Sequence, residues 1–344
     1  MIINSLKRPL RRLRTSIIRH LYRVAFVIGI LFGPSSVSFS DEVSVDEIRE
    51  SWRARTASIS SFHYECEVQI TTSGFRVDPF GDGDLPAEDK DKLHDLRTRQ
   101  TFSMESGRFA CTSIGDQLDP KNTVVSRDFR ACFGGSDYRT VLKGGLLPLG
   151  KLSETSQPGS QLTNGTQLVP LWLGYATHSI LTALNYMPER MEIANRDAYH
   201  GGQECIELDI PRKGRGWNGK LHVSRQAPYS PLCFRSTLND VTTQLINIEY
   251  SQDAAQLYPV ATFRNEIFDA KGRADRTIIG RVMSVVVNKP LPKATFELEF
   301  PVGTRVAHKK SDGQVTYFIQ KTGGIRESID QSKYGALPPS RKSE

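Results

Sequence analysis

The sequence predicts an α+β fold dominated by one large antiparallel β-sheet of about eleven strands. Three features indicate this class: many short segments in which apolar and polar residues alternate, only two segments with helical spacing, and no regular succession of strand and helix. An alternation of period two places successive side chains on opposite faces of a strand. We therefore expect a sheet with one apolar and one hydrated face, as antiparallel sheets have.

The first predicted strand, about residues 62–70, shows this alternation most clearly. Its apolar residues are Phe62, Tyr64, Cys66, Val68 and Ile70, and between them lie His63, Glu65, Glu67 and Gln69. Further strands are expected at about 97–104, 107–114, 127–133, 137–142, 190–198, 203–210, 219–224, 231–236, 242–250, 259–268, 275–287 and 294–300.

Two segments have the spacing of amphipathic helices. Ser44 and Glu47 form a capping-box pattern, in which the serine hydroxyl accepts from the N3 amide and the glutamate reaches back. The helix that follows is predicted over about 45–58, with Ile48 and Trp52 on one face. A second helix is predicted over 171–187 and ends before Pro188, because proline does not continue a helix.

Polar stretches divide the rest of the chain. Residues 74–95 are rich in Asp, and residues 150–168 are rich in Ser, Thr, Gly, Gln and Asn; both are predicted to be loop insertions within a domain of residues 41–325. Residues 326–344 are predicted to form a disordered tail.

The first 40 residues have the pattern of a signal peptide. Seven Lys and Arg residues precede residue 24, and no acidic residue occurs before Asp41. An uncharged apolar run over 24–33 and a segment of small residues follow, with Ser38 and Ser40 at the positions expected for cleavage. A retained N-terminal anchor is the alternative. We expect export to the periplasm or the extracellular space of a bacterial envelope.

The charge distribution argues against nucleic-acid binding. The seven basic residues of the leader equal the formal net charge of +7 of the whole chain, so the remainder is neutral. A neutral domain lacks the basic surface that binds phosphate backbones.

Neither an enzyme nor a metal site is predicted. The sequence contains no zinc-protease, nucleophile-elbow, phosphate-loop or dinucleotide motif, so we expect no catalytic residues and no cofactor. The spacing of the five cysteines matches no zinc knuckle, and His178, His200, His222 and His308 are interpreted as surface or satisfied histidines. The odd cysteine count leaves at least one thiol unpaired, and Cys111–Cys132 is the favoured disulfide pairing, because their segments could be neighbouring strands.

The order of elements is similar to that of the LolA/LolB superfamily of periplasmic lipoprotein carriers and receptors. It resembles most the secreted LolA-like proteins of bacteria such as planctomycetes, whose later part carries short motifs that this chain matches. The matches are Gly202–Leu208, Tyr258-Pro259 and the segment from Phe296 to Val306. The resemblance covers about residues 44–320. It implies a curved, incomplete barrel whose helices plug the concave side, and an apolar groove for acyl chains on that side.

Under this resemblance, the apolar strand faces and the second helix would supply the groove. The candidate ligand-binding residues are Phe62, Tyr64, Val68, Ile70, Trp172, Ile246, Ile248, Tyr250, Phe296 and Leu298. The alternative is that these residues form a plain core packed against the helices. We expect a monomeric, non-enzymatic envelope protein that binds a lipid, an acyl chain or a lipidated protein, with transient membrane contact and a role in lipoprotein trafficking. The alternatives are an envelope protein-interaction or stress-sensing module with a filled core, and a secreted hydrolase.

Overall fold

The fold was established from a computed structural model of the chain. It describes residues 42–72, 93–119, 122–144, 148–154, 169–175, 177–251, 257, 259–269 and 272–334, without the side chains of residues 172, 179 and 183. The predicted signal peptide, most of the predicted 74–95 loop and residues 155–168 of the second loop lie outside the described residues.

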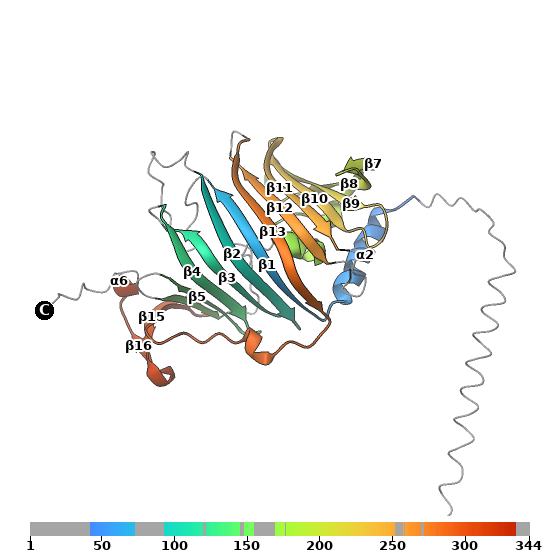
Figure 1. The fold of residues 1–344 in the computed structure, drawn as a ribbon. Coiled ribbons are helices and arrows are strands. Elements are labelled where there is room, and N and C mark those ends of the chain that lie inside the picture. The colour runs from blue at the N-terminus through green and yellow to red at the C-terminus, as the bar shows by residue number, and fades with distance from the viewer. Residues whose placement is uncertain are drawn as a thin grey trace, which may run out of the picture. The chain divides into compact units, whose positions relative to one another are not determined.

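The described strands form one mixed sheet (Figure 1), in the order β16-β15-β14-β6-β5-β4-β3-β2-β1-β13-β12-β11-β10-β9-β8-β7. All neighbouring strands in it are antiparallel except β14 and β6, which are parallel. The sheet is not closed into a barrel, since β16 and β7 form its two edges. The strand bounds are β1 Ser61–Thr72, β2 His94–Glu105, β3 Arg108–Leu118, β4 Val124–Phe133, β5 Asp137–Lys143, β6 Leu149–Glu154, β7 Glu192–His200, β8 Gln203–Pro211, β9 Trp217–Ser224, β10 Pro231–Leu238, β11 Val241–Tyr250, β12 Val260–Phe268, β13 Ala274–Val287, β14 Arg305–Lys309, β15 Val315–Gln320 and β16 Arg326–Ser328.

This architecture corrects the predicted fold class. The described part of the chain contains 16 strands instead of about eleven, and with few helices it is mostly β rather than α+β. The additional strands are short. Strand β6 occupies the start of the predicted 150–168 loop, β16 occupies the start of the predicted tail, and β14 and β15 lie in a segment for which no strand was predicted. Short strands with mixed polarity give a weak alternation signal, which is why pattern reasoning missed them.

The helix predicted at 45–58 is confirmed as α2 (Val45–Ala57). The Ser44 hydroxyl accepts a hydrogen bond from the Glu47 amide at 3.1 Å, which is half of the predicted capping box. The Glu47 carboxylate does not reach back to the cap; it accepts a hydrogen bond from the Tyr229 hydroxyl. The cap thus starts the helix, and Glu47 attaches it to the β9–β10 connection.

The second predicted helix is divided in two. Helix α4 covers Val169–Tyr175 and α5 covers Thr177–Ala183, and the short 3-10 helix η2 begins at Pro188. Helix α4 packs on β11 and β12, and α5 contacts α2. These short helices lie against one face of the sheet (Figure 1).

Register identifies this helix-covered face residue by residue. Directly paired residues of neighbouring strands point to the same face. Val68 pairs with Gly280, Gly280 with Phe263, and Phe263 with Ile248. A second row joins Ile70, Ile278, Asn265 and Ile246 in the same way. We call this side of the sheet the helix-covered face and the other side the opposite face.

The prediction of a strand at residues 294–300 is wrong. Residues Lys293–Phe296 form the 3-10 helix η4, and the chain to β14 then continues without regular structure along the opposite face of β2–β5. It is held there by the Leu298 carbonyl, which accepts from Arg139 at 3.2 Å, and by Phe296, whose ring lies 4.6 Å from the Arg108 guanidinium. Phe300 completes a second, smaller core on the opposite face with Leu152, Val306 and Phe318. The alternating apolar residues at 296–300 therefore belong to a connecting segment that packs on the sheet, not to a strand.

The predicted disordered tail contains regular structure at its start. Strand β16 is followed by the short helix α6 (Gln331–Tyr334), whose Tyr334 hydroxyl donates to the Gly150 carbonyl at 3.1 Å. Residues 335–344 lie outside the described part. None of the helices in the described residues has the length and apolar character needed to span a membrane.

Candidate functional site

The predicted groove residues of β1 and β11 converge on the helix-covered face, and most are completely buried there. Tyr64 and Ile246 are 0% exposed, and Val68 is 2% exposed. Phe62, Ile70 and Ile248 are also buried, and Tyr250 is half-buried. The prediction that these residues share one face is confirmed by the register. The near-zero exposure of Tyr64, Val68 and Ile246 shows that the described residues leave no open groove over these three side chains.

Aromatic side chains form the centre of this site. The Tyr175 ring of α4 stacks on Phe62 with centroids 5.7 Å apart and meets Tyr64 edge-on at 5.4 Å. Phe62 also lies 5.3 Å from Phe102 of β2. Aromatic pairs at such separations contribute roughly 0.5–1.5 kcal/mol beyond the area they bury. Through Tyr175, α4 covers the aromatic side chains at this part of the face.

A glycine lets α4 approach the sheet closely. A Cβ at Gly174 would lie 2.5 Å from a methyl group of Val260 and 3.4 Å from the Tyr250 hydroxyl. Distances below 3.0 Å do not occur between real Cβ atoms and their neighbours. Any larger residue at this position would require Val260 or α4 to shift.

Helix α2 is anchored by polar contacts at several points. The Trp52 indole N–H donates to the Tyr229 carbonyl at 2.9 Å, and the Arg49 guanidinium donates to the carbonyls of Pro188 and Glu189. Arg55 donates to the Leu257 carbonyl at 2.9 Å, and its guanidinium lies 5.2 Å from the Tyr175 ring. Burial lowers the pKa of Arg55 and raises that of Tyr250, although the two groups attract each other. Helix α2 thus combines these hydrogen bonds with the buried side chains of Ile48 and Trp52, whereas the Tyr175 side chain of α4 makes ring contacts.

Buried polar atoms that have no hydrogen-bond partner in the described ranges of the chain line the same face. They are Tyr64 Oη, His94 Nε2, Gln100 Oε1 and Thr140 Oγ1. Register places all four side chains on the helix-covered face of β1, β2 and β5. An unpaired buried polar group costs about 1–3 kcal/mol, so such groups usually have a partner. Sequence patterns could not indicate these atoms, because whether a buried group is satisfied depends on the packed structure.

A cavity of about 720 Å³ opens beside this site at one end of β8–β11. Two predicted groove residues, Ile248 and Tyr250, line it together with His200, Asn247 and Glu249. The turn between β9 and β10 forms another wall through Gln226, Ala227 and Pro228. The cavity brings solvent to the edge of the helix-covered face next to the anchor points of α2.

Two of the other candidate residues are placed differently from the prediction. Phe296 and Leu298 belong to the connecting segment on the opposite face, so they cannot contribute to a site under the helices. The side chain of Trp172 is outside the described part of the structure.

The predicted Cys111–Cys132 disulfide is not formed. Cys111 pairs with Ala131 and Cys132 with Ala110, so the two side chains point to opposite faces of the sheet. All five thiols are free and buried in the structure. Neighbouring strands were correctly expected, but the register excludes the bridge.

Comparison with known proteins leaves the family open. No family model and no curated protein matches the chain. A DUF1329 family protein from Desulfovibrio piger is similar in structure with a TM-score of 0.44 and 11% identity, over 74% of this chain and 97% of that one. MucB in its complex with MucA(peri) gives a TM-score of 0.20 and 8% identity, over 74% of this chain and 60% of that one. PNGF-II gives a TM-score of 0.22 and 7% identity over 72% of this chain and 32% of that one. Likeness at this level assigns neither a family nor an activity to the chain.

Proposed function

We propose that this protein is exported to the bacterial cell envelope and binds an acyl chain, as part of a lipid or a lipidated protein, against the helix-covered face. The observation that carries the proposal is the combination found on that face: an aromatic surface closed by short helices, with four buried polar atoms that have no hydrogen-bond partner among the described residues. The resemblance to LolA-like proteins supports the same function. The basic and apolar leader supports export.

Binding requires α4 to leave the sheet. An acyl chain would replace the contacts of Tyr175 with Phe62 and Tyr64, and burial of its surface stabilises the complex by about 25 cal/mol per Å². The unpartnered atoms Tyr64 Oη and Gln100 Oε1 would face the polar end of the ligand. Helix α2 stays in place, because it is held by hydrogen bonds to the β9–β10 turn and to η2. In this proposal, displacement of Tyr175 with α4 opens the binding site, and α2 remains in place beside it.

A fluorescent fatty acid tests this proposal. We expect saturable binding by the wild-type protein and tighter binding, by more than about tenfold, by Tyr175→Ala, because this variant needs less free energy to open the site. The control is Phe318→Ala, which removes a buried ring from the second core on the opposite face and should leave the affinity unchanged. Absence of saturable binding by both folded wild type and Tyr175→Ala would rule the proposal out.

A filled core is the second candidate. The near-zero exposure of Tyr64, Val68 and Ile246 favours it, since a packed core needs no ligand. The protein would then be an interaction or sensing module of the envelope and would use its outer surface. Failure of fatty-acid binding in the experiment above would select this function.

A further inference from the structure

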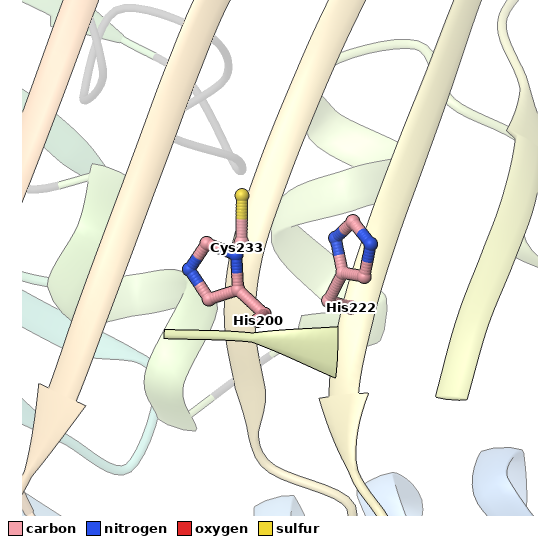
Figure 2. Close-up of side chains that lie close together, drawn as sticks. All are labelled: His200, His222 and Cys233. Atoms are coloured by element: carbon pink, nitrogen blue, oxygen red, sulfur yellow. The ribbon is translucent and has the colours of Figure 1, made fainter. Parts of the chain in front are cut away.

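A cluster of two histidines and a cysteine lies on the opposite face, away from the helices. His200 ends β7, His222 lies on β9 and Cys233 lies on β10 (Figure 2). One possible ligand atom from each residue lies within 4.8 Å of those of the other two. Zinc bonds to nitrogen and sulfur are about 2.0–2.3 Å long, so donors around one ion lie within about 4 Å of one another. Small side-chain rotations therefore bring these three donors to bonding distance of a single ion.

The fold brings these residues together although they are far apart in sequence. Cys233 and His222 are direct cross-strand partners, and His222 is the direct partner of Glu207 on β8. The β7–β8 hairpin adds His200, whose ring stacks on that of His222 at 5.5 Å. The scattered positions of the histidines in the sequence hid this arrangement.

His222 is oriented as a metal ligand would be. Its Nε2 lies 3.1 Å from a Glu207 carboxylate oxygen, and that carboxylate also accepts from the Lys220 ammonium at 2.6 Å. The other ring nitrogen, Nδ1, is buried and has no hydrogen-bond partner. With Nε2–H donated to Glu207, Nδ1 presents its lone pair. A carboxylate that orients a histidine in this way is the usual support of a metal-bound imidazole.

A possible fourth ligand, which is an oxygen atom, and a route from solvent both lie next to the cluster. Asn247 is the direct partner of Cys233 on β11, and its side-chain oxygen is buried without a hydrogen-bond partner. Asn247 and His200 both line the 720 Å³ cavity described above. An ion can therefore reach the cluster from solvent.

From this arrangement we propose that His200, His222 and Cys233 bind one divalent transition-metal ion of the zinc–copper class. Ions of this class bind thiolate and imidazole ligands well, whereas Mg²⁺ and Ca²⁺ prefer oxygen ligands. On binding, the metal–sulfur bond replaces the S–H bond of Cys233, and the proton passes to solvent. Asn247 or a small molecule from the cavity occupies the remaining position.

Cobalt(II) titration of the chelator-treated, untagged protein tests the site. We expect one equivalent to bind with the visible bands of a four-coordinate ion and a thiolate-to-cobalt charge-transfer band. Cys233→Ala should remove the charge-transfer band, and Glu207→Gln should weaken binding by about 10- to 100-fold, because the orienting carboxylate is lost. Displacement of cobalt by zinc or by copper then identifies the preferred ion.

Matched variants separate this site from unspecific binding. His308 also pairs with a carboxylate, Glu154, at 2.9 Å, and Cys111 is a buried thiol on the helix-covered face. His308→Ala and Cys111→Ala should bind cobalt as the wild type does, with circular dichroism confirming the fold of every variant. The proposal is overturned if the wild type shows no charge-transfer band at one equivalent, or if the band persists in Cys233→Ala.

Discussion

The two faces of β1 differ sharply in their surroundings, although their residues alternate along a single strand. On the helix-covered face, Tyr64 and Val68 are almost completely buried, and Tyr64 meets the Tyr175 ring of α4. On the opposite face, Glu65 pairs with Arg99, and Glu67 and Gln69 are exposed. The same contrast continues across the sheet, where the opposite face carries the His200–His222–Cys233 cluster. The two proposals assign a different kind of ligand to each face: an apolar chain to the helix-covered face and a metal ion to the opposite face.

The largest difference between the faces should appear when a charge is introduced at neighbouring positions of β1. Val68→Glu buries a carboxylate without a partner and should lower the free energy of unfolding by roughly 3–5 kcal/mol. Gln69→Glu places the same group on the exposed side and should change stability by less than about 0.5 kcal/mol. Urea denaturation of both variants measures the two values. Equal losses of unfolding free energy in the two variants would mean that the faces are not distinct.

The same reasoning makes a charged residue at Phe62 or Tyr64 a poor test of ligand binding, because the fold itself would be lost.

A smaller difference should appear when single hydroxyl groups are removed. Tyr64 Oη is buried without a partner, so Tyr64→Phe should leave the protein equally stable or up to about 1–2 kcal/mol more stable. On the opposite face, Thr101 shares a hydrogen bond of 2.7 Å with Thr112, and Thr101→Val should cost about 1 kcal/mol. Thermal unfolding measures whether Tyr64→Phe is as stable as the wild type or more stable, and whether Thr101→Val is less stable. Destabilisation by Tyr64→Phe would show that its hydroxyl has a partner in the native state.

The smallest effect concerns the thiols, which should be almost unreactive on both faces. Burial raises the pKa of Cys111 to about 12 and that of Cys132 to about 11, so very little thiolate forms near pH 8. We expect negligible reaction with a thiol reagent in the native protein, and reaction of all five cysteines in denaturant with a chelator present. Only three reactive thiols in denaturant would indicate a disulfide and contradict the register of β3 and β4.

Local patterns predicted the parts of the fold that depend on residues close in sequence. The alternation from Phe62 to Ile70 located β1, and the Ser44 cap located the start of α2. The shared face of β1 and β11 followed from the alternation and the resemblance together, and the register confirms it. These features depend on local periodicity, which the sequence carries directly.

Features that depend on contacts between distant segments were not predictable in the same way. The alternation of Phe296, Leu298 and Phe300 resembles a strand, but these residues lie on a connecting segment that crosses the opposite face. The His200–His222–Cys233 cluster depends on the pairing of β9 with β10 and on the β7–β8 hairpin. The relation of Cys111 to Cys132 depends on a register offset of one residue, which reverses the face of a side chain.

Native mass spectrometry of the protein, purified without detergent from bacteria that express the full chain, tests lipid binding on the helix-covered face most directly. The proposed function predicts a discrete additional mass of a lipid or acyl chain on a fraction of the molecules, lost on denaturation. A bound metal ion would add a much smaller mass and is distinguished by its size. A protein mass without any lipid, together with no uptake of fatty acid by Tyr175→Ala, would contradict the proposal and identify the helix-covered face as a filled core.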